Sequence, residues 1–81
     1  MKLAGKIAIV TGSGGPGSGR AVARRFAQEG ATIVVSDIDR AGGAETERLI
    51  AAEGGRATFL ICDVRDEEQL NTLIDETCER F

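Results

Sequence analysis

Apolar residues follow two different patterns along this chain. Three short runs are almost continuously apolar and rich in β-branched residues, a pattern that predicts buried strands of a parallel sheet. These runs cover residues 6–11, 32–36 and 57–62. After each run, apolar residues recur at intervals of three and four, which predicts an amphipathic helix.

The expected helices have recognisable start and stop residues. The first follows a glycine-rich loop and stops at Gly30, since glycine commonly ends a helix. The second begins after Asp39, a good capping residue, and closes at Gly54. The third begins after Asp66, and Gln69, three positions later, completes the pattern of a capping box. The chain therefore alternates strand and helix three times.

Strands that alternate with helices imply a parallel sheet with right-handed crossovers. We expect a three-layer α/β fold with strand order 3-2-1, one half of a doubly wound sheet, and the third helix on the opposite face from the first two. The first strand then keeps an unpaired edge, and apolar surface stays exposed. We therefore expect residues 1–81 to be a single segment truncated from a larger domain. Gly42 and Gly43 should each weaken the second helix by up to about 1 kcal/mol, so that its first turn frays.

The composition excludes several classes of partner. Thirteen acidic residues face ten basic ones, for a net charge of −3, and the basic residues are scattered, so we expect no nucleic-acid partner. No apolar run is long enough for a membrane span or a signal peptide, and we expect a cytoplasmic protein with no membrane partner. Cys62 and Cys78 match no metal-binding spacing, so we expect no metal site.

Missing residue types limit catalysis. The chain contains no histidine and no tyrosine. Histidine above all moves protons near neutral pH, and tyrosine is another common general acid or base. Any catalysis would have to use the remaining candidates, which are carboxylates, two thiols and two lysines near the N-terminus.

The glycine-rich loop at residues 12–19 is the first candidate for binding. A diphosphate needs the backbone to approach closely, and glycine permits this because it has no Cβ. The start of the following helix adds free N–H groups and the positive end of the helix dipole. Gly12, Gly17 and Gly19 suit this task, because they lie between a buried strand and an amphipathic helix. The alternative is a flexible surface turn.

Asp37, at the end of the second strand, is the second candidate. In a strand–helix–strand unit this position faces the ribose of a nucleotide on the loop, where a carboxylate accepts hydrogen bonds from the 2′ and 3′ hydroxyls. A 2′-phosphate would meet like charge there, and Ile38, which follows, is not basic. The pattern favours NAD over NADP. The alternative is that Asp37 only caps a turn.

Asp63 and Val64 close the third strand, beside the expected adenine pocket. The carboxylate of Asp63 can accept from the adenine amino group, and the Val64 N–H can donate to the ring. On spacing alone, a simple turn aspartate at position 63 is an equally good interpretation.

Together these motifs resemble the N-terminal half of the short-chain dehydrogenase/reductase family. That family has Thr-Gly-x-x-x-Gly-x-Gly after the first strand, an acidic residue after the second in NAD-preferring members, and Asp-Val after the third. Here the same places read Thr11-Gly12 to Gly17-Ser18-Gly19, Asp37 and Asp63-Val64. The resemblance implies a Rossmann-type sheet and an NAD(H)-dependent oxidoreductase that transfers hydride between nicotinamide and an alcohol or ketone. The cofactor-binding residues it implies are Gly12, Ser13, Gly17, Ser18, Gly19, Asp37, Ile38, Asp63 and Val64.

The loop departs from the family pattern. Four residues separate Gly12 from Gly17 where the family has three, and one of them, Pro16, has no N–H to donate. Ser18 stands where the family usually has an apolar residue, and it is available to cap the helix. A second register, Gly12-x-Gly14-x-x-Gly17, fits the broader dinucleotide fingerprint. Which N–H groups meet phosphate therefore stays open.

The resemblance also implies what is missing. The family's catalytic Ser, Tyr and Lys, and its Asn-Asn-Ala-Gly segment, have no counterpart here, so we assign no catalytic residue and expect the chain alone to be inactive. Thr11 would be structural, its hydroxyl tying the loop to neighbouring chain.

Two other functions fit part of the pattern. The first is a free-standing nucleotide-binding or assembly module without catalysis, which self-associates through the exposed edge of the first strand. The second is a methyltransferase-like protein that uses S-adenosylmethionine. Such proteins usually carry an acidic residue just before the glycines, where this chain has Val10 and Thr11.

Overall fold

Three parallel strands form the middle layer of the structure, a computed structural model that describes residues 2–81. The elements are β1 (Ile7–Thr11), α1 (Ser18–Gln28), β2 (Thr32–Asp37), α2 (Arg40–Ala52), β3 (Arg56–Ile61) and α3 (Glu67–Arg80). β2 lies between β1 and β3, with Thr32 paired to Ile7 on one side and to Arg56 on the other. The predicted α/β class and the strand order 3-2-1 are confirmed.

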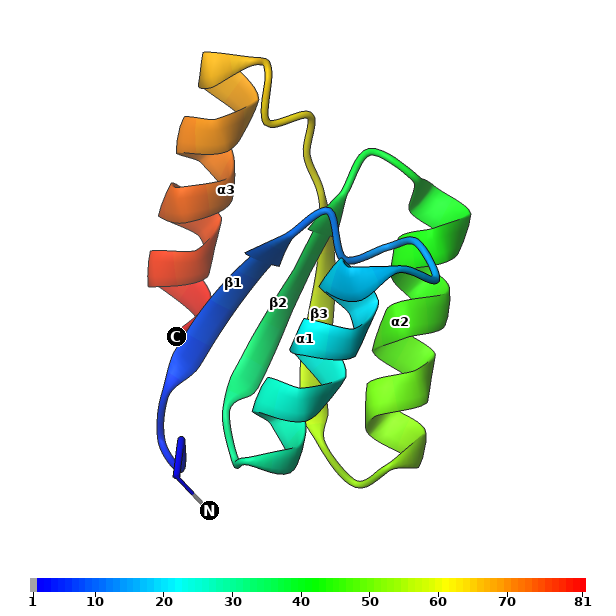
Figure 1. Ribbon diagram of the computed structural model, residues 1–81. Coiled ribbons are helices and arrows are strands. Elements are labelled where there is room, and N and C mark those ends of the chain that lie inside the picture. The colour runs from blue at the N-terminus through cyan, green and yellow to red at the C-terminus, as the bar shows by residue number, and fades with distance from the viewer. Residues whose placement is uncertain (1) are drawn as a thin grey trace.

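The helices cover both faces of this sheet (Figure 1). α1 and α2 pack side by side on one face, and α3 crosses the other. Successive side chains of β2 point to opposite faces of the sheet, as in any strand. Ile33 and Val35 pack toward α1 and α2, whereas Val34 packs with Leu73 of α3. All three β2 side chains are fully buried, so β2 is the centre of the fold.

Aspartates cap α2 and α3 as the sequence predicts. The Asp39 carboxylate accepts from the Gly42 N–H, and that of Asp66 accepts from the N–H groups of Glu68 and Gln69. The capping box is only half formed, because the Gln69 amide oxygen accepts from the Asp63 N–H at 2.9 Å. The N–H of Asp66, its expected donor, is bonded instead to the Asp63 carbonyl.

The expected serine cap of α1 is wrong. Ser18 is already the first helical residue, and the capping position belongs to Gly17, whose φ of −101° and ψ of −154° are extended. No side chain caps this helix. The first turn of α1 therefore presents its N–H groups without a competing side-chain acceptor.

The two glycines early in α2 have a packing role. The first turn, which the sequence predicts to be frayed, is a regular part of the helix. A Cβ on Gly43 would overlap the Phe59 ring, and one on Gly42 would overlap the Gly14 carbonyl oxygen. Glycine lets α2 lie close to both β3 and the loop, which outweighs its low helix propensity.

β1 keeps one edge without a neighbour in the part of the chain that the structure describes, as expected. Ile7 and Ile9 of β1 are 43% and 38% exposed, and Val22 and Phe26 of α1 are exposed to a similar degree. Apolar surface thus gathers at this end of the sheet. None of the described helices is long and apolar enough to cross a membrane.

Candidate functional site

The glycine-rich loop connects the carboxyl end of β1 to the start of α1. Gly12 has a φ of +65°, in the left-handed region that favours glycine. A Cβ on Gly19 would overlap the Gly12 carbonyl oxygen, so the two ends of the loop are in van der Waals contact. Both positions need glycine for backbone reasons, and the loop is an ordered turn with a defined shape.

The outer side of the loop is open. A Cβ on Gly15 or Gly17 would meet no atom within 4 Å, and Ser18 is exposed. The first turn of α1 has no acidic residue, in contrast to α3, which begins with Glu67 and Glu68. Free N–H groups at the positive end of a helix dipole, with room in front of them, suit an anion.

Ser13 supports the loop from inside the protein. Its hydroxyl donates to the Val10 carbonyl at 2.6 Å and accepts from the Ser36 N–H at 3.2 Å. Its own N–H donates to the Ser36 carbonyl at 3.1 Å. The structural tie that the sequence assigns to Thr11 is therefore made by Ser13, whose side chain is fully buried, while Thr11 is exposed.

Asp37 lies at the rim of the loop. One carboxylate oxygen accepts from the Gly14 N–H at 2.9 Å, and the other accepts from the Asp39 N–H at 2.9 Å. The hydrogen bond from Asp39, helped by those from Gly14 and Ile38, lowers the pKa of Asp37 against the opposing effect of desolvation. Asp37 thus both stabilises a turn and faces the glycine loop. Its carboxyl group is ionised at neutral pH.

A pocket of about 370 Å³ opens beside Asp37. Five of the residues that the sequence singles out line it together. The lining consists of Gly12, Asp37, Ile38, Cys62, Asp63, Val64 and Arg65. The side chains of Ile38 and Val64 are 58% and 50% exposed, so two apolar surfaces are open to a flat ring.

Asp63 has a partner that the sequence reasoning missed. The Arg65 guanidinium donates to both carboxylate oxygens, each at 3.0 Å, and lowers the pKa of Asp63. The Arg65 side chain is 82% exposed, and an ion pair so exposed contributes little to stability. A ligand that offers a hydrogen bond to Asp63 can therefore share or displace this contact.

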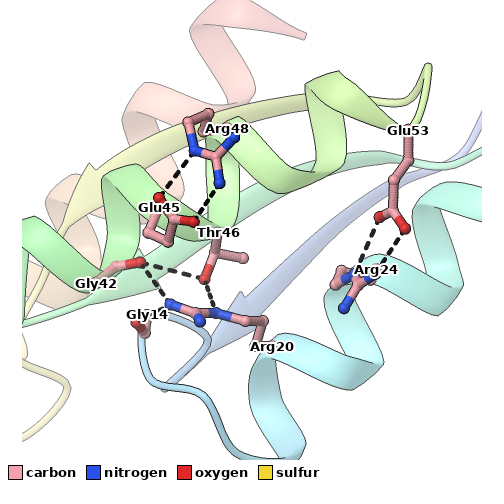
Figure 2. A network of polar contacts seen from close by, with 8 residues as sticks. All are labelled: Gly14, Arg20, Arg24, Gly42, Glu45, Thr46, Arg48 and Glu53. Carbon is pink, nitrogen blue, oxygen red and sulfur yellow. Dashed lines mark hydrogen bonds and ion pairs between the residues drawn. The ribbon is translucent and has the colours of Figure 1, made fainter.

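Arg20, the residue after Gly19, is the second group that the sequence reasoning missed. It leaves α1 sideways toward α2 and donates to the Thr46 hydroxyl at 2.8 Å and to the Gly14 carbonyl at 3.0 Å (Figure 2). A third contact reaches the Gly42 carbonyl at 3.3 Å. The Thr46 hydroxyl in turn donates to the Ser13 carbonyl at 2.6 Å. Loop, α1 and α2 are thereby joined in one network.

Two hollows larger than this pocket lie elsewhere in the described part of the chain, and neither is lined by the motif residues. A larger hollow of about 970 Å³ lies at the opposite end of the sheet, lined largely by glycine, alanine and threonine, away from the motif residues. Among residues 2–81, no group of three His, Cys, Asp or Glu side chains could hold a metal ion. Cys62 is buried, Cys78 is exposed, and both are free thiols.

Comparison with known proteins gives consistent relatives. A family model described as enoyl-(acyl carrier protein) reductase matches residues 15–81. L-fucose dehydrogenase from Bos taurus is 44% identical over 80 residues, which are 99% of this chain and 28% of that protein.

Solved structures agree with these matches. A hydroxysteroid dehydrogenase from Escherichia coli superposes with a TM-score of 0.94 at 38% identity, over 98% of this chain and 33% of that one. A 7α-hydroxysteroid dehydrogenase solved with NADH and 7-oxo glycochenodeoxycholic acid gives 0.88 at 40% identity, over 91% and 29% of the two chains. The chain thus spans about a third of the length of the relatives it matches.

Proposed function

Because the chain belongs to the short-chain dehydrogenase/reductase family, we propose that it binds NAD(H) as one segment of an oxidoreductase. The whole protein would transfer hydride between the nicotinamide and an alcohol or ketone. Residues 1–81 would form a single dinucleotide-binding segment of a larger domain.

One observation carries the proposal: the open, uncapped start of α1 and the Asp37 carboxylate lie at the two sides of one loop. Gly14 donates its N–H to Asp37, and Gly17, three residues later, is the N-cap of α1. A dinucleotide offers a diphosphate and a ribose at neighbouring positions, which matches this pair of groups. The space in front of Gly17 leaves room for the diphosphate.

Each part of the nucleotide has residues that fit it. The N–H groups of Gly17, Ser18 and Gly19 would meet the diphosphate, since the amides in the first turn of a helix have no partner within the helix. The pocket between Ile38 and Val64 would take the adenine ring. Asp63 would accept from the adenine amino group, and the Val64 N–H would donate to the ring. Gly12 and Ser13 would shape the loop beneath them.

We propose NAD over NADP on electrostatic grounds. The Asp37 carboxylate has lone pairs left for the 2′ and 3′ hydroxyls after its two backbone contacts. A 2′-phosphate would bring a charge of about −1.5 to −2 next to it, and exposed Ile38 offers no compensating cation. The net charge of −3 adds to this repulsion.

The bound nicotinamide would accept or donate the hydride. Residues 1–81 contain no tyrosine, so the proton-transfer group of the family cannot come from them, and we infer that this segment alone is inactive. A cytoplasmic location stays a prediction from the sequence.

Calorimetry on the protein expressed from its complete coding sequence tests the proposal. We expect NAD to bind more tightly than NADP, and Asp37→Asn to reduce that preference by weakening NAD and relieving the repulsion of NADP. Tighter binding of NADP by the wild type, or an unchanged preference in Asp37→Asn, would contradict the cofactor assignment. Absence of binding to either would contradict the function.

A second candidate is the assembly module without catalysis. The free edge of β1 and the exposed Ile7 and Ile9 favour it, because an unpaired strand edge is a template for another chain. Sedimentation with and without Ile9→Lys distinguishes the two. A dimer that the lysine dissociates supports assembly through β1, and a protein that stays in one state in both variants argues against it.

A further inference from the structure

Arg20 has hydrogen-bond partners of a different kind from those of four other arginines in this chain. Arg24, Arg25, Arg48 and Arg65 pair with carboxylates, but the acceptors that the structure gives Arg20 are two backbone carbonyls and a hydroxyl. A partly buried guanidinium whose direct partners are neutral oxygens offsets its desolvation chiefly through those contacts, with a smaller coulombic attraction from Glu45. Its geometry therefore points to a specific structural task at the loop.

That task is visible at Gly14, the residue on which three elements converge. A Cβ on Gly14 would lie 2.7 Å from the Asp37 Cβ and 2.9 Å from the Gly43 nitrogen. The opposing Gly42 has no room for a Cβ either, because of the Gly14 carbonyl oxygen. The loop, which has one residue more than the family pattern, is thus seated between β2 and the first turn of α2, and only glycines fit this contact.

The two polar groups of Gly14 link Arg20 to Asp37. The carbonyl of Gly14 accepts from Arg20 at 3.0 Å, and its N–H donates to Asp37 at 2.9 Å. The two groups lie on the peptide planes that meet at the Gly14 Cα, and the close packing around Gly14 limits rotation there, so holding the carbonyl also restrains the N–H. Thr46 holds Arg20 from the α2 side and anchors the neighbouring Ser13 carbonyl.

We propose that Arg20 is a positioning residue for ribose recognition: it clamps Gly14 onto α2, and the Gly14 N–H then orients Asp37. This inference rests on the proposed binding of NAD. Arg20 touches no part of the nucleotide in this account and acts only through Gly14. Removing it would loosen the Gly14 contact and leave Asp37 held only from its own side, by the N–H groups of Ile38 and Asp39, so that the carboxylate is less firmly aimed at the hydroxyls.

Arg20→Met tests the proposal, because methionine keeps the apolar stem and removes the donors. In the complete protein, we expect NAD affinity to fall about tenfold, the change that 1.4 kcal/mol represents. NADP affinity should stay the same or rise by less than about threefold, since a displaced carboxylate repels the 2′-phosphate less, so the NAD:NADP preference falls. Arg20→Lys should restore part of the preference.

Arg24→Met is the matched control. Arg24 lies one turn further along α1 and also reaches α2, where it makes a two-pronged ion pair with Glu53 at 3.0 and 2.7 Å (Figure 2). Its loss should lower the thermal midpoint but leave the NAD:NADP preference unchanged. An Arg20→Met protein with the wild-type preference, or an equal loss of preference in Arg24→Met, would overturn the proposal.

A second pair keeps the test decisive if Arg20→Met does not fold. Thr46→Val removes the hydroxyl that holds Arg20 while keeping the side-chain shape, and Thr46→Ser keeps the hydroxyl. We expect a reduced NAD:NADP preference in the valine variant and a preserved one in the serine variant. An equal NAD:NADP preference in Thr46→Val and Thr46→Ser would overturn the positioning role of Arg20. A wild type that binds neither dinucleotide refutes the proposed function itself, whereas normal binding with an unaltered preference in the variants refutes only the role of Arg20.

Discussion

Gly17→Ala separates binding at the start of α1 from folding. The backbone of Gly17 is extended, a conformation that alanine adopts, and its Cβ would point into open space. Alanine is a poorer N-cap than glycine, so we expect the free energy of unfolding to fall by only about 0.5–1 kcal/mol.

The same methyl group should block the diphosphate. It would stand where the phosphate oxygens approach the first-turn amides, and a hydrogen bond to a charged group is worth about 1.5–3 kcal/mol. Losing one such bond weakens NAD binding by about 10- to 150-fold. Calorimetric titration of the complete protein, with a thermal melt of each variant, measures the two effects separately.

Two alanine substitutions in the same loop serve as controls. Gly15→Ala also points into open space but lies before the helix, so NAD affinity should stay within about twofold of the wild type. Gly19→Ala would press on the Gly12 carbonyl and should destabilise the fold itself. If a folded Gly17→Ala protein binds NAD as tightly as the wild type, the diphosphate does not dock at α1 and the reasoning fails.

Three further predictions concern stability. The lowered pKa of Asp37 means that its carboxylate contributes stability above the unfolded pKa of about 3.9 and loses it as the pH falls through the lower folded pKa; acid titration of Asp37→Asn should show a smaller loss below about pH 4 than the wild type. Gly43→Ala should lower the free energy of unfolding, measured in urea, by about 1–3 kcal/mol although alanine has the better helix propensity, and adding Phe59→Leu should recover part of this loss. An unchanged stability in Gly43→Ala would show that the Phe59 ring can move aside. Glu47 accepts from the outward Phe59 N–H on edge strand β3, so Glu47→Ala should raise the rate of aggregation in light scattering, and an unchanged rate would show that this contact does not protect the edge.

The sequence was sufficient for most of the fold. The sequence predicts all six elements because strands and helices leave different apolar patterns. A strand covered on both faces reads as a continuous β-branched run, whereas a helix buried on one face has apolar residues every three or four positions. Asp39 and Asp66 mark helix starts through local hydrogen bonds that depend only on nearby residues. The strand order follows from the short right-handed crossovers that such units require.

The candidate site was predicted in part. Asp37, Ile38, Asp63 and Val64 come together at one pocket because they all follow the carboxyl ends of parallel strands. The contacts of Arg20 could not be foreseen, since its partners on α2 lie more than twenty residues away and the hydrogen bonds depend on the packing angle of two helices.

Glycines were the hardest residues to interpret. Gly42 and Gly43 look like weak points when only helix propensity is considered, and their role becomes clear once Gly14 and Phe59 are seen against them. Which residue anchors the loop, Thr11 or Ser13, could likewise not be decided without the three-dimensional contacts. The Ser13 hydroxyl turns inward to the Val10 carbonyl, and this orientation depends on how the loop packs in three dimensions.

A crystal structure of the complete protein with bound NAD tests the central claim most directly. We predict diphosphate oxygens within hydrogen-bond distance of the amides at Gly17–Gly19, and ribose hydroxyls on the Asp37 carboxylate. A nucleotide bound elsewhere, or a diphosphate held by side chains while the start of α1 faces only solvent, would contradict the account.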